Sequence, residues 1–144
     1  GGIRFDSLPD RAISTGMIFS LEPFSSKLCT MDMTPEQMRR MIIAKYNDTD
    51  NPKESHRVDL FSNVPYKIVT SADGEARDVV FEGLAEGHAY RVVMGDYMYN
   101  NYKAVEAANA VCEDILLTEV LMDDLRENSP IDYSNERVQT VEGE

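Results

Sequence analysis

The segment Tyr90–Tyr102 reads Tyr-Arg-Val-Val-Met-Gly-Asp-Tyr-Met-Tyr-Asn-Asn-Tyr and holds four of the seven tyrosines of the chain. Residues 90–94 are mostly β-branched or aromatic and predict a buried strand. Gly95-Asp96 and Asn100-Asn101 predict turns. A strand that ends in aromatic rings and amides favours a site for a planar polar ligand. The alternative is that the tyrosines pack on neighbouring elements with their hydroxyls in water.

The chain on both sides of this segment predicts further short strands. Residues 66–71 and 76–82 flank Asp73-Gly74, which is a strong signal for a two-residue hairpin. Residues 27–33 alternate in a strand-like pattern, with Cys29, Met31 and Met33 on one side. Residues 58–61 and 137–141 predict two more strands. The Ala-rich residues 104–111 are expected to form a loop or a short helix.

Two main helices are expected among these strands. Thr34-Pro35-Glu36-Gln37 predicts a helix start with a capping box, and apolar residues at helical spacing continue the helix to Asn47. Residues 117–125 predict an amphipathic helix that Pro130 stops, with Glu113 and Asp114 near its N-terminal end. A short helix is also expected within residues 13–21. The mixture indicates a single α+β domain with a mixed β-sheet and two main helices.

Composition excludes some classes of function. The 144 residues carry 26 acidic and 14 basic side chains, a formal net charge of −12, which opposes binding of a nucleic acid polymer. No apolar run approaches the roughly 20 residues that span a bilayer. The start, Gly1-Gly2-Ile3-Arg4, lacks an initiator methionine and predicts a fragment of a longer polypeptide.

The cysteines and histidines give no metal or catalytic pattern. Cys29 and Cys112 are too few for a disulfide framework, and they are expected to be buried free thiols. His56 and His88 stand far apart in sequence, without the spacing of metal ligands or of a general base. No residue forms a convincing pair of nucleophile and base, so we expect no catalytic residue and no metal site in this chain.

The order of several short motifs resembles a known family. Gly-Gly-Ile-Arg at residues 1–4 is followed by Leu-Glu-Pro-Phe at 21–24, then by a strand, a capped helix, a hairpin and Tyr-Arg-Val-Val-Met-Gly-Asp-Tyr at 90–97. Glu119-Val120-Leu121 and Glu136-Arg137-Val138 close the series. This order is similar to the C-terminal domain of the 5′-nucleotidases, which include UDP-sugar hydrolases and 2′,3′-cyclic phosphodiesterases. The resemblance covers residues 1–144.

The resemblance implies a set of substrate-binding residues. Arg4 matches an arginine near the substrate phosphate, which a guanidinium can bind in a bidentate manner. Phe24 and Tyr97 match two aromatic walls that stack on a nucleobase, each stack favourable by about 1–3 kcal/mol. Arg11 is a candidate second phosphate contact. The plain alternatives are that Arg4 pairs with Asp6 or Asp10 and that Phe24 belongs to the core.

The segment after Tyr97 departs from the family pattern, and Val64-Pro65 replaces a glycine pair that the family has before the middle strand. The family follows the second aromatic residue with a Gly-Gly-Asp-Gly segment whose aspartate binds the ribose, whereas this chain reads Met98-Tyr99-Asn100-Asn101-Tyr102. Asn100 or Asn101 are the candidates for the sugar contact, and Asp96 is a further candidate. The departure leaves open a non-catalytic binding or scaffolding module in which nucleotide binding is altered or lost.

The resemblance also implies partners and a location. The substrate would be a nucleotide or nucleotide sugar. A metallophosphoesterase domain with two divalent metal ions would act in cis or on a separate chain. The implied location is the periplasm, the cell surface or the extracellular space.

Overall fold

Helix α2 (Pro35–Asn47) joins two three-stranded sheets into one core. The computed structural model describes residues 12–50, 56–57, 59–60, 62–130 and 139–143. Thr34 accepts a hydrogen bond from the Gln37 amide and the Gln37 side chain accepts one from the Thr34 amide, so the predicted capping box is confirmed. The helix ends at Asn47, as expected.

The first sheet has β1 (Lys27–Met33) at its centre. Strands β4 (Tyr90–Gly95) and β5 (Ala108–Leu116) pair with it on either side, both antiparallel. β1 alternates as predicted, because Cys29, Met31 and Met33 are fully buried. β4 was expected to be buried, but it is an edge strand in which only Met94 is buried.

A disulfide joins Cys29 on β1 to Cys112 on β5, so the expectation of two free thiols is wrong. The two cysteines are separated by 83 positions in sequence and become direct partners in the β1–β5 register. A residue on each of two paired strands is close enough for a disulfide only when the register places the two opposite each other. The bond therefore fixes β5 to β1 covalently.

The second sheet is mixed. Its central strand β2 (Tyr66–Thr70) pairs antiparallel with β3 (Ala76–Phe81) and parallel with β6 (Gln139–Gly143). The hairpin predicted around Asp73-Gly74 is confirmed, and Gly74 has a φ of +78°, which suits glycine in such a turn. The strand expected at 137–141 is confirmed as β6 for its described residues.

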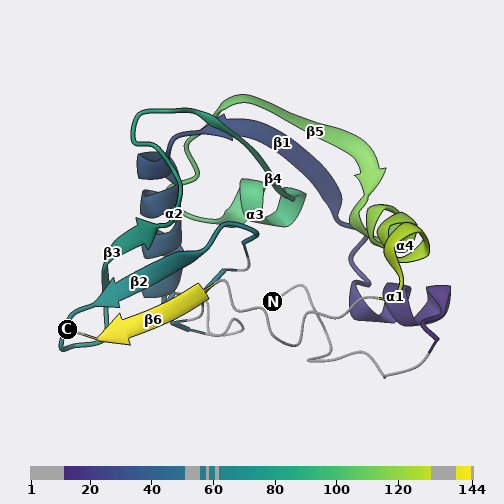
Figure 1. The fold of residues 1–144 in the computed structure, drawn as a ribbon, viewed down its shortest axis with the longest axis horizontal. Coiled ribbons are helices and arrows are strands. Elements are labelled where there is room, and N and C mark those ends of the chain that lie inside the picture. The colour runs from purple at the N-terminus through teal and green to yellow at the C-terminus, as the bar shows by residue number, and fades with distance from the viewer. Residues whose placement is uncertain (1–11, 51–55, 58, 61, 131–138, 144) are drawn as a thin grey trace.

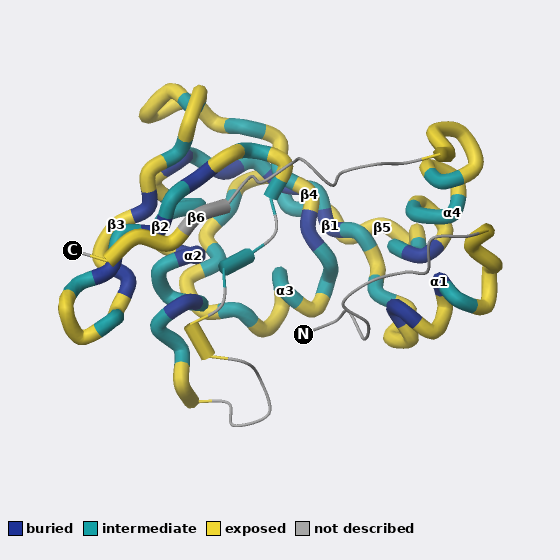
Figure 2. The backbone as a smooth tube through the Cα atoms, turned by 60° about the horizontal axis from the view of Figure 1, so that its bottom comes forward, coloured by how far each residue is buried: buried dark blue, intermediate teal, exposed yellow. Residues whose placement is uncertain are grey.

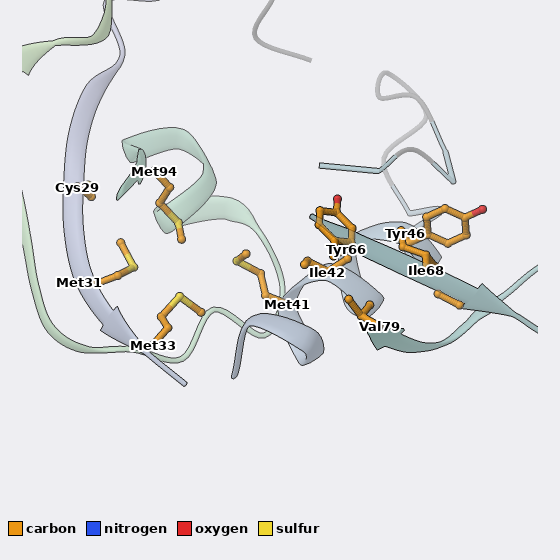
Figure 3. Close-up of a cluster of buried hydrophobic side chains, with 11 residues drawn as sticks. Cys29, Met31, Met33, Met41, Ile42, Tyr46, Tyr66, Ile68, Val79 and Met94 are labelled. Atoms are coloured by element: carbon orange, nitrogen blue, oxygen red, sulfur yellow. The ribbon is translucent and has the colours of Figure 1, made fainter. Parts of the chain in front are cut away.

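The core lies between α2 and the two sheets. Met31, Met33 and Met94 from the first sheet point toward Met41 of α2, as Figure 3 shows. On the other side of the same cluster, α2 packs on the apolar face of the second sheet; the contributing residues are Ile42, Tyr46, Tyr66, Ile68, Ala76 and Val79. Unbranched methionines fill an irregular space between a helix and a sheet well.

A smaller pair of helices packs at the other end of the first sheet. α1 (Thr15–Leu21) and α4 (Leu117–Asn128) lie where β1 begins and β5 ends (Figure 1). Ile18, Leu21 and Thr118 are buried in this pair and do not belong to the main cluster. Figure 2 shows α1 and α4 beside each other, away from α2 and the second sheet. Ser14 caps α1 by accepting from the Met17 amide, so the helix begins where the sequence predicts.

Three local expectations differ from the structure. The Tyr-Asn segment forms a short helix, α3 (Asp96–Asn101), where turns were predicted. Residues 108–111 belong to β5 and not to a loop or a short helix, and Glu113 and Asp114 lie in β5 too. Of the strand expected at 58–61, Asp59 and Leu60 are not in a strand, and residues 58 and 61 lie outside the described residues.

The α+β fold class is confirmed. The strands divide between two sheets, of which only the second is mixed. Figure 1 shows the first sheet arching between α2 at one end and the α1–α4 pair at the other. This arch places the start of β1 beside the end of β4, which is where two of the predicted site residues lie.

Candidate functional site

Phe24 lies in the turn between α1 and β1. Its side chain is 52% exposed, so it does not belong to the core, which was the plain alternative. The turn is attached to α4, because the Leu117 amide donates to the Ser26 carbonyl oxygen at 2.8 Å. The ring therefore stands at the surface on a loop that is fixed at its C-terminal end.

Tyr97 lies in the first turn of α3, directly after β4. Its side chain is 51% exposed. The Tyr102 ring packs edge-on against it, with centroids 6.2 Å apart and planes at 85°. Lys45, near the end of α2, places its ammonium group 4.9 Å from the Tyr102 ring centroid. Tyr102 thus connects the Tyr97 ring to the end of α2.

Asp96 links the two segments that carry the aromatic rings. Its Oδ1 accepts a hydrogen bond from the Lys27 amide at 3.2 Å and from the Tyr97 amide at 2.9 Å. In the strand register Leu28 is opposite Gly95. Phe24 is three positions before Lys27, so it and Tyr97 are attached to the same end of the β1–β4 strand pair.

The two candidate sugar-binding amides differ in their surroundings. The Asn101 Nδ2 donates to the Tyr97 carbonyl oxygen at 2.9 Å, within α3. This bond uses one of the donors of the Asn101 amide and holds the side chain against the helix. Asn100 is exposed on the same helix. Both residues belong to the same short helix as Tyr97. Their roles in sugar binding stay predictions.

The two candidate phosphate-binding arginines, Arg4 and Arg11, lie outside the described residues. Among the residues that the structure does describe, Lys27 is the cation nearest in sequence to Phe24, and its ammonium pairs with Asp114 at 2.6 Å. The hydrogen bond and the charge of Asp114 raise the pKa of Lys27. Lys27 is thereby held toward β5.

The described residues include no group of three or more His, Cys, Asp and Glu side chains placed to hold a metal ion. Nor does this part of the chain contain a helix long and apolar enough to cross a membrane. The chemistry that the described site can offer is stacking on aromatic faces and hydrogen bonding to amides.

Sequence reasoning missed two contributors to this site. Glu22 was noted only as part of a motif, but its buried carboxylate hydrogen-bonds Ser26 across the Phe24 turn. Tyr102 was noted as an aromatic residue without its contact to Tyr97. The sequence spacing of Glu22 and Ser26, or of Tyr97 and Tyr102, did not predict either contact, because both contacts depend on the folded conformation of the turn and of α3.

No protein-family model and no curated protein matches the sequence. Solved structures do match the fold. The chain is similar to the 5′-nucleotidase precursor from Thermus thermophilus, with 19% identity and a TM-score of 0.67, over 90% of this chain and 28% of that one. It is similar to the NAD nucleotidase of Haemophilus influenzae, with 13% identity and a TM-score of 0.73, over 99% and 28%.

A third similar structure is a putative 5′-nucleotidase from Staphylococcus aureus, with 17% identity and a TM-score of 0.63, over 89% of this chain and 29% of that one. The predicted resemblance in fold is therefore confirmed. The chain spans less than a third of the length of each of these proteins.

Proposed function

We propose that this chain is the nucleotide-recognition domain of a 5′-nucleotidase-type phosphoester hydrolase. The base would stack between Phe24 and Tyr97, and the phosphate would face Arg4 and Arg11. The observation that carries the proposal is the pair of half-exposed rings on segments joined through Asp96. Exposed aromatic faces are costly to leave in water and are what a planar base needs.

Hydrolysis would require a second domain. In this proposal a metallophosphoesterase domain, in cis or on a separate chain, supplies two divalent metal ions and the attacking water. The proposal is supported by nucleotidases of similar fold that are more than three times the length of this chain. The present chain would bind the nucleoside part and hold the phosphate toward that domain.

The proposed location is the periplasm, the cell surface or the extracellular space. The Cys29–Cys112 disulfide supports it, because disulfides persist in oxidising compartments and are rare in the cytosol of most organisms.

Calorimetric titration of the chain with AMP and with adenosine tests the proposal. Tyr97→Ala and Phe24→Ala should each weaken both ligands by about tenfold, or 1.4 kcal/mol, because both contacts are to the base. Arg4→Ala should weaken AMP by about tenfold and leave adenosine unchanged, because the contact proposed for Arg4 is to the phosphate alone.

Phe19→Ala is the matched control. Phe19 is an exposed aromatic residue on α1, outside the proposed site, so its removal should leave both affinities unchanged. UDP-glucose as a third ligand tests whether the site accepts a nucleotide sugar. Equal affinities in wild type, Tyr97→Ala and Phe24→Ala for every ligand would contradict the stacking role.

A non-catalytic binding or scaffolding module is the second candidate. It is favoured by the sequence Met98-Tyr99-Asn100-Asn101-Tyr102, which replaces the Gly-Gly-Asp-Gly segment that the family resemblance implies. Absence of saturable binding to nucleosides, nucleotides and nucleotide sugars would favour this candidate. Binding to any of them would favour the recognition domain.

A further inference from the structure

The turn that carries Phe24 contains a buried carboxylate. Glu22 is 3% exposed, although charged side chains are rarely buried without a specific partner. Its Oε1 accepts from the Ser26 hydroxyl at 2.7 Å and its Oε2 accepts from the Ser26 amide at 3.4 Å. The carboxylate thus spans the turn from its first residue to its last.

Both ends of the turn are fixed to helices. The Glu22 amide donates to the Ile18 carbonyl oxygen of α1 at 3.1 Å, and the Ser26 carbonyl accepts from Leu117 of α4. Between them, Ser25 has a φ of +53°, a left-handed conformation that side chains with a Cβ seldom adopt. A turn with such a residue needs additional contacts to keep one conformation.

We propose that Glu22 is a positioning residue, whose hydrogen bonds to Ser26 hold the Phe24 ring in one orientation for stacking. The inference rests on the proposed function, because it gives Glu22 its role through the base-stacking ring. Pro23 and Ser25, the neighbours of Phe24, are exposed, so the bonds across the turn are well placed to set the backbone that carries the ring. An ordered ring binds a base better than a mobile one, because less conformational freedom is lost on binding.

Three variants test how far the hydrogen bonds between Glu22 and Ser26 contribute to AMP affinity. Glu22→Ala removes both acceptors and should weaken AMP binding by about five- to tenfold. Glu22→Gln keeps one acceptor oxygen and should lie between wild type and Glu22→Ala. Ser26→Ala removes the hydroxyl donor and leaves the carboxylate, which gives a second route to the same result if Glu22→Ala fails to fold.

A double-mutant cycle with Phe24→Ala separates positioning from a general loss of structure. In the Phe24→Ala background, Glu22→Ala and Ser26→Ala should have no further effect on AMP affinity, because the ring that they position is absent. Glu127→Ala, an exposed glutamate on α4, controls for the change in charge. Equal weakening with and without Phe24, or unchanged affinity in both single variants, would overturn the inference.

The Phe24 ring also reports on the turn without any ligand. With selectively labelled phenylalanine, the Phe24 ring resonances should shift and narrow toward those of a mobile residue in Glu22→Ala, but not in Glu127→Ala. If the wild-type chain binds no nucleotide, the proposed function fails while this measurement still decides whether Glu22 holds the ring. Phe24 resonances unchanged in both Glu22→Ala and Ser26→Ala would overturn the positioning role.

Discussion

The Oδ1 of Asp96 accepts the backbone amide of Lys27 at 3.2 Å, which ties the start of β1 to the start of α3 across 69 positions of sequence. The same oxygen accepts the Tyr97 amide. One carboxylate oxygen therefore fixes the segment after Phe24 relative to the segment that carries Tyr97. This bond and the β1–β4 register together relate the two segments that carry the aromatic rings.

Asp96→Ala should weaken nucleotide binding and cost stability. Loss of an acceptor for two backbone amides is expected to lower the free energy of unfolding by about 1–2 kcal/mol. Asp96→Asn keeps Oδ1 as an acceptor and should restore most of both properties. Urea denaturation and AMP titration measure the two effects. Asp124→Ala, at an exposed position on α4, is the control. An Asp96→Asn variant no better than Asp96→Ala would show that acceptance of the two amides is not what matters.

Removal of the disulfide should destabilise the chain strongly. A cross-link between residues 83 positions apart restricts the unfolded chain, and its loss is expected to cost about 2–5 kcal/mol. The measurement is the urea midpoint of the wild-type chain with and without a reducing agent.

The Cys29→Ser, Cys112→Ser double variant is the control for that measurement, and its urea midpoint should not respond to the reductant. Labelling of free thiols under denaturing, non-reducing conditions should find none in the wild-type chain. Two labelled thiols per wild-type molecule in the absence of a reducing agent would refute the disulfide itself.

Met33→Ala should be among the most destabilising single substitutions in the core. Met33 is fully buried between the first sheet and α2, so truncation leaves a cavity and should cost about 2–5 kcal/mol. Val111→Ala, at a half-exposed position on β5, should cost less than about 1 kcal/mol. Thermal and urea unfolding compare the two. Similar losses for both variants would mean that the methionine cluster is loosely packed.

Tyr66 should make the chain sensitive to alkaline pH. Burial raises the pKa of the Tyr66 hydroxyl to about 12, and the hydroxyl donates to the Leu60 carbonyl oxygen. Because the folded-state pKa lies above the unfolded value of about 10, the neutral phenol stabilises the fold fully below pH 10. This contribution is lost as the pH rises from about 10 to about 12, at no more than about 1.4 kcal/mol for each pH unit.

Comparison of the urea midpoint of the wild-type chain with that of Tyr66→Phe over this pH range isolates the effect from the other groups that titrate there. The wild-type midpoint should fall more steeply than that of the variant. Parallel curves would contradict a buried, hydrogen-bonded phenol.

The features that the sequence predicted well are those set by neighbours in the chain. The capping box at Thr34–Gln37 and the hairpin at Asp73-Gly74 require contacts across only three or four residues. Both could therefore be read from residue types alone. The alternation of Cys29, Met31 and Met33 was also sufficient to orient β1.

The features that were missed depend on distant partners. Residues 108–111, Ala-Asn-Ala-Val, have weak strand propensity, and they form part of β5 because β1 pairs with them and because Asn109 donates to Asp32 at 2.7 Å. The disulfide follows from the same pairing. In the candidate site, the roles of Phe24 and Tyr97 stay predictions. The Asp96 bond between their two segments and the Glu22 bond across the Phe24 turn could not be predicted, because both depend on the folded backbone.

The disulfide also closes part of the chain into a covalent ring and leaves both ends of the chain outside that ring. The covalent ring from Cys29 to Cys112 contains α2, the β2–β3 hairpin, β4 and α3, whereas α1 and α4 lie outside it. A protease that cuts the exposed hairpin turn near Asp73 would leave two fragments joined as one molecule. The nicked chain would keep its apparent mass on a non-reducing gel and separate into two bands only after reduction. Phe24 precedes the cut and Tyr97 follows it, so the proposed base site would be shared by the two fragments and held together by that bond.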